Sequence, residues 1–177
     1  MSNVSIQTLS PTDLLDRVAE LNRILIDSVE QGAAIGFIHP LSGSAATAFW
    51  QETVAPELAT TRRTMFVAEL SGSMVGTVQL ITAMPPNQPH RCEIIKMVVH
   101  PDARRKGVGR ALLSAAIDYA RRTGKTLVTL DTRTEDAAEQ LYASVGFDRS
   151  GTIPDFALDP DGGRRHATTY MYLRIPS

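Results

Sequence analysis

The sequence of 177 residues lacks the features typical of disulfide-bonded, nucleic-acid-binding and membrane-spanning proteins. Its single cysteine, Cys92, excludes an internal disulfide bond and is typical of a reducing compartment. The net charge of −1 argues against a broadly basic surface for nucleic acid. No apolar run approaches the length of a membrane span, and the N-terminus lacks a signal-peptide pattern. We therefore expect a cytoplasmic protein that binds neither nucleic acid nor membrane.

Metal-ligand spacing is also missing, because the histidines are scattered along the chain. They are His39, His90, His100 and His166. We expect no metal site, and we expect His100 to be a solvated residue where a strand ends. Hydrophobic residues make up 43% of the chain and charged residues 21%, as in an ordinary globular protein. The length suits one domain over residues 1–177 with a substantial core.

The most informative segment is the run Met97–Arg110. An apolar strand is followed by a basic loop, and Gly107 and Gly109 open an apolar helix predicted over residues 108–123. The first amides of a helix have no intrahelical acceptor, and the helix dipole adds positive potential there. Four cations surround these amides: Arg104, Arg105, Lys106 and Arg110. The pattern predicts a pyrophosphate pocket; the alternative is an ordinary connection with a solvated basic loop.

Two familiar phosphate motifs are excluded by spacing. The string G-x-x-x-x-G-K-[ST] of nucleotide hydrolases does not occur, and Leu112 stands at the third glycine of a dinucleotide fingerprint. What remains is [RQ]-x-x-G-x-G over residues 104–109, directly after an apolar strand. This motif resembles the acetyl-CoA signature of the GNAT superfamily of N-acetyltransferases.

A second segment, Ala138–Phe147, resembles the A-x-x-L-Y-x-x-x-G-F motif of the same superfamily. It predicts a short helix that ends at Gly146 and leads into a strand. Leu141 and Tyr142 are adjacent and cannot share one face of that helix, so one can anchor it while the other meets a different environment. Tyr142 could instead be a half-buried aromatic of the core.

The periodicity along the chain predicts the order strand, two helices, three strands, helix, strand, helix, two strands. A capping pattern at Ser10 starts the first helix, which runs towards Gly32, and a second helix covers about 44–58. The apolar strand 93–99 is expected to be buried on both faces. The resemblance implies the α/β (α+β) GNAT fold, a mixed and mostly antiparallel sheet of about seven strands, splayed in the middle and flanked by about four helices.

The resemblance implies acetyl-CoA as the acetyl donor. The loop 104–110 would bind its pyrophosphate, and the strand edge at Met97 and Val99 would pair with the pantetheine arm. A backbone amide near Val98 or Val99 would donate to the thioester oxygen. The expected cofactor-binding residues are Met97, Val98, Val99, Arg104, Arg105, Lys106, Gly107, Val108, Gly109 and Arg110.

Three residues are candidates for the chemistry of acetyl transfer. Tyr142, whose ordinary pKa is near ~10, is protonated at neutral pH and could protonate the leaving thiolate. Glu93 or Asp131, each flanked by apolar residues, could take the proton of the amine directly or through water. The alternatives are a solvent-facing strand residue for Glu93 and a turn cap for Asp131. Many GNAT members have asparagine where this chain has Glu135, so that asparagine's role is not transferred here.

Acceptor contacts are expected from the connector 32–40, from Gln79 and from the loop 159–166, while Phe37 and Ile38 could wall a pocket or pack the first helix. Short strings most resemble the tabtoxin-resistance acetyltransferases, which implies a small-molecule amine such as a toxin, an antibiotic or an amino-acid-like compound. Two alternatives stay open, a protein or peptide N-acetyltransferase and a catalytically silent acetyl-CoA sensor. The oligomeric state is open, and the resemblance is compatible with a homodimer.

Overall fold

The computed structural model describes residues 4–176, which contain a seven-stranded sheet in the order β1-β2-β3-β4-β5-β7-β6. Neighbouring strands are antiparallel except β4 and β5, which are parallel. The strands are β1 (Val4–Thr8), β2 (Arg63–Leu70), β3 (Ser73–Ile81), β4 (Arg91–Val99), β5 (Leu127–Arg133), β6 (Asp148–Leu158) and β7 (Arg165–Arg174). This sheet confirms the predicted fold class.

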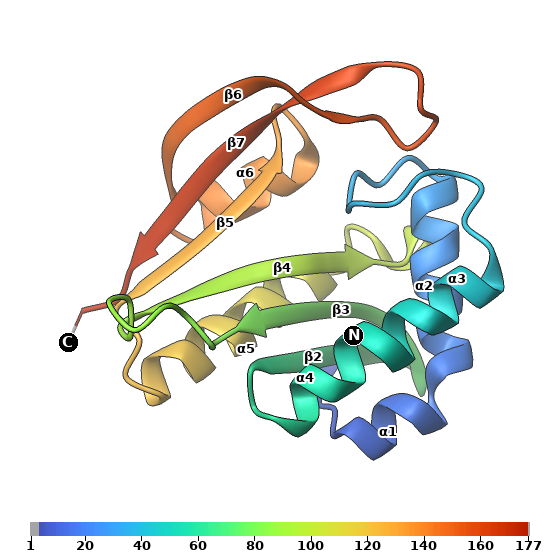
Figure 1. Cartoon of the computed structure of the whole chain (residues 1–177), viewed down its shortest axis with the longest axis horizontal. Helices are drawn as coiled ribbons and strands as arrows, with labels where there is room; N and C mark the ends of the chain where they lie inside the picture. Colours follow the sequence, from blue (N-terminus) through green and yellow to red (C-terminus); the bar gives the residue numbers. More distant parts are fainter. Residues whose placement is uncertain (1–3, 177) are drawn as a thin grey trace.

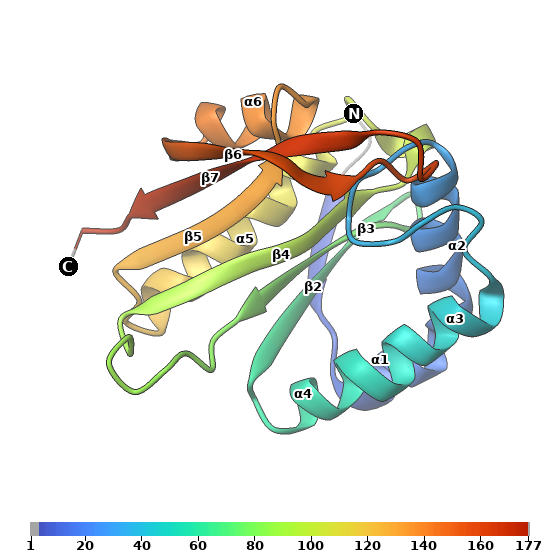
Figure 2. The same ribbon diagram turned by 45° about the horizontal axis from the view of Figure 1, so that its top comes forward.

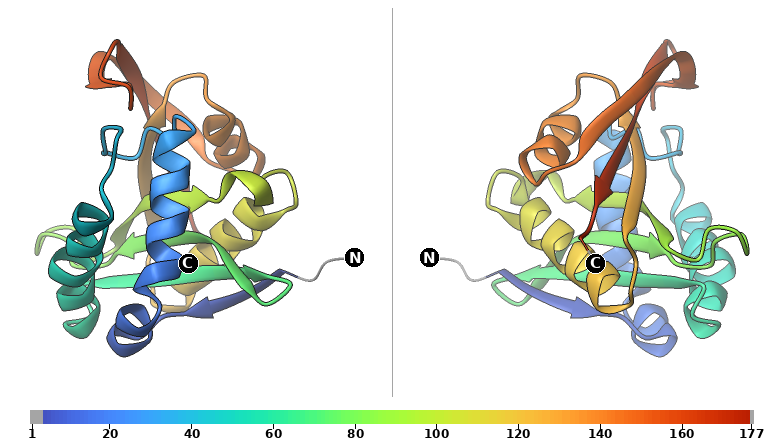
Figure 3. Two further views of the ribbon diagram at one scale, coloured as in Figure 1. Left: turned by 90° about the vertical axis from the view of Figure 1, so that its right-hand side faces the viewer. Right: turned by 90° about the vertical axis from the view of Figure 1, so that its left-hand side faces the viewer.

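Helices cover both faces of the sheet (Figure 3). They are α1 (Pro11–Asp16), α2 (Val18–Glu30), α3 (Gly43–Ala48), α4 (Ala55–Ala59), α5 (Val108–Arg122) and α6 (Ala137–Ser144), with a π-helical turn η1 (Phe49–Val54) and a 3-10 turn η2 (Pro101–Ala103). α5 and α6 lie on one face, and α1 to α4 lie on the other. Within residues 4–176 no helix combines the length and apolar character needed to cross a membrane.

The first predicted helix begins as expected but is divided into α1 and α2 at Arg17. Ser10 caps α1, because its side chain accepts from the amide of Asp13 while the Asp13 carboxylate accepts from the amide of Ser10. Arg17 leaves the helical region, with φ −111° and ψ 17°. The second predicted helix is continuous, but η1 joins α3 to α4 just before Pro56, which has no amide to extend an α-helical ladder.

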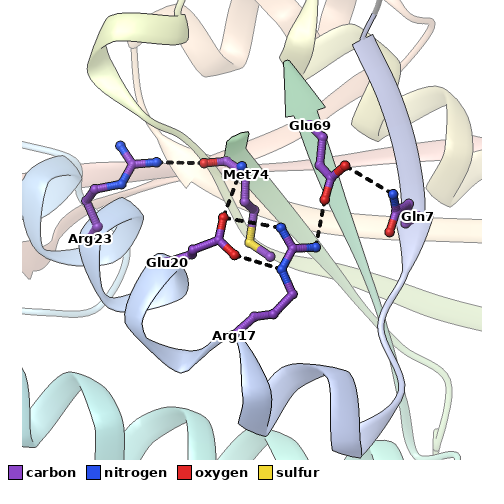
Figure 4. A network of polar contacts seen from close by, with 6 residues as sticks. All are labelled: Gln7, Arg17, Glu20, Arg23, Glu69 and Met74. Atoms are coloured by element: carbon purple, nitrogen blue, oxygen red, sulfur yellow. Dashed lines mark hydrogen bonds and ion pairs between the residues drawn. The ribbon is translucent and has the colours of Figure 1, made fainter. Parts of the chain in front are cut away.

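A polar network holds the joint between α1 and α2 against the β2–β3 hairpin (Figure 4). Arg17 binds Glu20 at 2.8 Å and Glu69 at 2.7 Å, and Glu69 also accepts from Gln7 at 3.1 Å. The backbone of Met74 donates to Glu20 and accepts from Arg23. Every charged group at this joint therefore has a partner, and we call these residues the Arg17 network.

The sheet separates two hydrophobic cores, one under α5 and α6 and one under α1 to α4. Along β4, Cys92 and Ile94 are buried on the α5 side, whereas Glu93, Ile95 and Lys96 are only half-buried on the way to the strand's end. The prediction that this strand is buried on both faces is therefore wrong. The cause is the geometry of the next strand, which turns away from β4.

β4 and β5 pair over only three residues, and the last pair joins Glu93 to Thr129. Beyond it the two strands diverge into a V, which Figure 1 shows opening towards α2. A β-bulge on β4 coincides with the opening, because three steps from Ile95 to Val98 oppose two steps on β3. Lys96 sits in this bulge with φ +50°. The V leaves one backbone edge of β4 without a strand beside it, next to the loop that opens α5.

Candidate active site

The loop before α5 presents a cluster of backbone amides. After η2 the chain turns through Arg105 at φ +61° and Gly107 at φ +82°, and Gly107 is the N-cap of α5. In the described chain the amides of residues 105–107 donate to no other backbone group, and the first amides of α5 have no intrahelical acceptor. A Cβ on Gly107 would meet nothing within 4 Å, so the surface in front of it is open. Such a cluster suits a phosphate group.

The predicted cations of this loop are exposed and have few partners. Arg104 reaches the carbonyl of Val99 at 3.4 Å, and Arg110 donates to the Ser144 hydroxyl on α6 at 3.0 Å. Arg105 and Lys106 make no side-chain hydrogen bond or ion pair with residues 4–176. Their charge is therefore available to an anionic ligand. Val108 contributes its amide only, because its side chain is buried in the core.

Gly109 also has a role in packing that the sequence did not indicate. A Cβ on Gly109 would lie 2.8 Å from Cδ2 of Leu141, so a side chain there would push α5 away from α6. The glycine is therefore needed for the packing of the two helices, and its proposed place in the acetyl-CoA motif stays a prediction. Leu141 is thus the anchor of the second motif, which leaves the neighbouring Tyr142 for another environment.

His100 is buried rather than solvated, with 6% of its surface exposed. Its Nε2 lies 2.9 Å from the Asp27 carboxylate of α2, and its Nδ1 accepts from the amide of Asp102. His100 therefore fixes the start of the loop before α5 to α2. The sequence offered no signal for this contact, because Asp27 lies 73 residues away.

The backbone of β4 between Ile94 and Val99 faces the V without a strand partner on the β5 side. Met97 and Val99 are partly buried against the core under α5, and Val98 packs into the core under α1 to α4. These three residues therefore offer backbone groups rather than side chains to a ligand in the V. An extended chain of amides could pair with such an edge.

Tyr142 lies in the core, yet its hydroxyl has no protein partner among residues 4–176. Only 5% of the residue is exposed, and its ring packs edge-on against Phe147 with centroids 5.9 Å apart. Burial raises the pKa of the hydroxyl, and the charges of Asp131 and Asp136 raise it further. The group therefore stays protonated at neutral pH, as a proton donor must.

The two carboxylates are not equivalent. Glu93 pairs with Arg91 at 3.1 Å, and the same guanidinium also holds the Thr129 hydroxyl. Asp131 has no ion pair in the described chain, and its Oδ2 accepts from the Thr168 hydroxyl at 3.0 Å. Although its neighbours in the sequence include apolar residues, Asp131 itself is exposed in the open V. Its negative charge helps to raise the pKa of the Tyr142 hydroxyl, after the larger effect of burial.

Lys96 is a member of this cluster that the sequence analysis missed. Its Nζ donates to the carbonyl of Ile35 at 2.6 Å and lies 5.3 Å from the ring centre of Phe37. Burial and the charge of Arg63 lower the pKa of its ammonium, and Asp131 opposes that shift. A lysine within the run Ile94–Val99, whose other residues are apolar, was the available signal. The direction of the Lys96 side chain depends on the bulge, which the local sequence pattern does not predict.

The connector between α2 and α3 meets the loop between β6 and β7 over this face of the sheet (Figure 2). The His39 amide donates to the Pro160 carbonyl at 2.7 Å, which joins the two segments. Phe37 packs against Phe49 with ring centroids 5.1 Å apart, while Ile38 remains 47% exposed. Of this pair only Phe37 therefore helps to pack the helices. The described surface also has open hollows of about 380 and 470 Å³ along β5 and β7, away from the phosphate loop and Tyr142.

Comparisons with known proteins agree on one family. Residues 35–147 match the model of the acetyltransferase (GNAT) family. An uncharacterized protein of Mycobacterium leprae is 30% identical over 86% of this chain, which spans 37% of that protein. An L-methionine sulfoximine/L-methionine sulfone acetyltransferase of Salmonella typhimurium is 37% identical over 44% of each chain. The structure of yncA from Salmonella typhimurium, an acetyltransferase solved with acetyl-CoA, covers 99% of this chain and 96% of its own with TM-score 0.77 and 25% identity.

Proposed function

We propose that this chain, which belongs to the acetyltransferase (GNAT) family, transfers an acetyl group from acetyl-CoA directly to the primary amine of a small molecule. The observation that carries the proposal is the V between β4 and β5. An amide cluster at the start of α5 and a free strand edge lie at this opening, and Asp131 there acts electrostatically on the Tyr142 hydroxyl. The amide cluster and the strand edge suit binding of the acetyl donor, and Tyr142 and Asp131 suit the proton transfers.

The residues present fit acetyl-CoA. The open surface before Gly107 and the unpartnered cations Arg105 and Lys106 would take the pyrophosphate. The unpaired edge of β4 from Met97 to Val99 would hold the amides of the pantetheine arm. When bound, the molecule supplies an activated acetyl thioester. The chain itself binds it, orients it and exchanges protons.

The proton transfers follow from the two groups that face the V. Asp131 accepts the proton of the incoming ammonium, directly or through water, so that the amine nitrogen becomes nucleophilic. We assign this role to Asp131 rather than Glu93, because Arg91 already neutralises Glu93. A backbone amide near Val98 donates to the thioester oxygen as the N–C bond forms. As the C–S bond breaks, the Tyr142 hydroxyl protonates the departing sulfur, and the second proton that the nitrogen loses on becoming an amide returns to Tyr142 through water.

Enclosure of the acceptor side favours a small molecule over a peptide. The bond from His39 to Pro160 and the bond from Lys96 to Ile35 hold the connector over the face that carries Asp131. An extended peptide would need an open groove at this point. The likeness to an enzyme named for two small amino-acid analogues supports the same choice, as does the resemblance to tabtoxin-resistance enzymes. We therefore propose a toxin, an antibiotic or an amino-acid-like compound as acceptor.

The test is release of free thiol from acetyl-CoA across a panel of small amines, β-lactam amino acids and N-terminal peptides. We expect thiol release that depends on a small amine. The only cysteine is silent in this assay, because Cys92 is fully buried and burial raises its pKa to about 11. Turnover with peptides alone would contradict the small-molecule acceptor. Tight acetyl-CoA binding without turnover on any amine would favour the sensor.

A further inference from the structure

The acceptor side of the V carries two charges that its own residues leave uncompensated. Most charges near it are paired: Arg63 with Glu57, Arg91 with Glu93, and Arg133 with Asp159. In residues 4–176, Lys96 has no carboxylate within ion-pair distance, and Asp131 has no cation. One free cation and one free anion therefore face the same opening. Lys96 is partly buried, and a partly buried charge without a partner is costly, so it points to a ligand that completes it. Asp131 is exposed in the V, where its free carboxylate is open to the same ligand.

The bulge determines what Lys96 can reach. It interrupts the alternation of β4 at Lys96 and Met97, and the lysine side chain reaches the connector, where its Nζ bonds Ile35 and approaches the face of Phe37. An ammonium has three donors, and the Ile35 carbonyl uses one of them. Two N–H groups remain for a ligand under the connector. The charged end of Lys96, with its Nζ 5.3 Å from the ring centre of Phe37, is therefore the polar feature of this wall.

Gln79 supplies an independent observation beside Lys96. It pairs across the strands with Ile95, the residue before Lys96, and its side chain is fully buried. Its Oε1 accepts from the guanidinium of Arg63, whereas its Nε2 has no partner within the described chain. A buried amide N–H₂ without an acceptor is rare in native proteins. Its requirement is met by an oxygen atom, as is that of the Lys96 ammonium.

We propose that the acceptor is a small free amino acid, whose carboxylate binds Lys96 with Gln79 beside it and whose amine faces Asp131. This inference rests on the proposed function and adds the substrate class and Lys96 as the residue that selects it. Two-point binding turns the amine towards Tyr142 and the thioester. A polycationic amine would place like charge against Lys96. A peptide N-terminus would bring no carboxylate to it, because the first carboxyl group is in an amide bond.

The experiment compares each free L-amino acid with its own carboxamide as acetyl acceptor, using kcat/KM from thiol release. We expect the free acid to be preferred by roughly tenfold or more, the size of a hydrogen-bonded charge pair. In Lys96→Met this ratio falls towards one, and Lys96→Arg keeps part of it. The matched control is Lys125→Met, because Lys125 also donates to a backbone carbonyl, that of Pro89, but lies away from the V.

A merely structural role for Lys96 has a different signature. If Lys96 only holds the connector through Ile35, Lys96→Met slows acids and carboxamides equally and leaves their ratio unchanged, which overturns the inference. Carboxamides used as well as acids by the wild type also overturn it, while the proposed function stands. Calorimetric titration of amino acids onto the protein with CoA covers the case without turnover. Binding of acids and not carboxamides supports the inference, and binding of neither overturns it.

Discussion

Two polar clusters, the Arg17 network and the residues at the V, differ in how their charges are satisfied. In the Arg17 network each charged side chain has a partner, and Arg17 alone binds Glu20 and Glu69 at 2.8 and 2.7 Å (Figure 4). At the V, Lys96 and Asp131 have no ion pair, and Tyr142 has no hydrogen bond in the described chain. Charged side chains of comparable type therefore have protein partners in the Arg17 network and lack them at the V.

The difference separates residues that hold the fold from residues that wait for a ligand. A satisfied cluster contributes to stability and has no donor or acceptor to spare. An unsatisfied cluster costs stability and is retained at sites where a substrate completes it. Changes in the Arg17 network should therefore lower the free energy of unfolding and leave turnover unchanged. Changes to Lys96, Asp131 or Tyr142 at the V should lower turnover and change the free energy of unfolding little.

The largest effect is expected for Tyr142→Phe, which removes only the hydroxyl at the V. We expect kcat to fall by about 100-fold or more, because the general acid is lost, while acetyl-CoA affinity stays the same. Stability should change little, since the hydroxyl has no partner in residues 4–176 to lose and the ring still packs against Phe147. Steady-state kinetics and thermal unfolding check both parts.

Tyr119→Phe is the matched control for that variant. Tyr119 of α5 packs against Phe66 in the same core, with ring centroids 5.7 Å apart, and lies outside the proposed site. It should retain full kcat. Equal losses in both variants would mean that any tyrosine change in this core disturbs the enzyme, and full activity of Tyr142→Phe would remove the assigned acid.

The next effect is expected for Gly107→Val, compared with Gly72→Val in the β2–β3 turn. The two glycines share φ near +80°, and a Cβ at either would meet nothing within 4 Å. Both variants should lose a similar stability, about 1–2 kcal/mol, because valine is strained at positive φ. Only Gly107→Val should lose acetyl-CoA affinity, by roughly tenfold or more, as its side chain enters the phosphate site. If calorimetry gave the same acetyl-CoA affinity for Gly107→Val and Gly72→Val, phosphate binding by the loop before α5 would be contradicted.

Local signals accounted for the parts of the fold that the sequence could predict. The Ser10 cap depends on neighbours within three residues, and the strand-loop-helix run at Gly107 needs only its own composition. The segment Ala138–Phe147 likewise folds as a capped helix because its apolar anchor and its glycine are close in sequence. For such elements a short stretch of chain contains the physical cause.

The features that sequence could not predict depend on partners far along the chain. The break at Arg17 is held by Glu69, and the burial of His100 depends on Asp27. The need for glycine at position 109 comes from Leu141 on another helix. The sequence did not predict that Lys96 lies at the site, because a one-residue bulge redirects its side chain. A register shift of this kind leaves no pattern in composition.

Arg17→Met tests the contribution of the Arg17 network to stability. Loss of the guanidinium leaves the partly buried Glu69 carboxylate without its cation. We therefore expect the free energy of unfolding to fall by about 1–2 kcal/mol, with kcat unchanged. Arg121→Met is the control, because Arg121 forms an ion pair with Asp118 in which both side chains are more than half exposed. That change should cost less than about 0.5 kcal/mol. Equal losses in urea unfolding would mean that the Arg17 network is no more than a surface pair.

The smallest effect is expected in the pH dependence of the same cluster. The bond from Arg17, followed by the backbone amide of Met74, holds the pKa of Glu20 below its ordinary value of 4.5. The folded state thus binds this proton less readily than the unfolded chain does, so the stabilisation is complete above the ordinary pKa and is lost as pH falls through the lower, folded value. Glu20→Gln should therefore show a shallower loss of stability between about pH 5 and pH 3 than the wild type. Arg17→Met should show the same shallower slope, because it removes the main cause of the shift. Parallel slopes for all three proteins in acid titrations of urea unfolding would show that Glu20 is not held by the Arg17 network in solution.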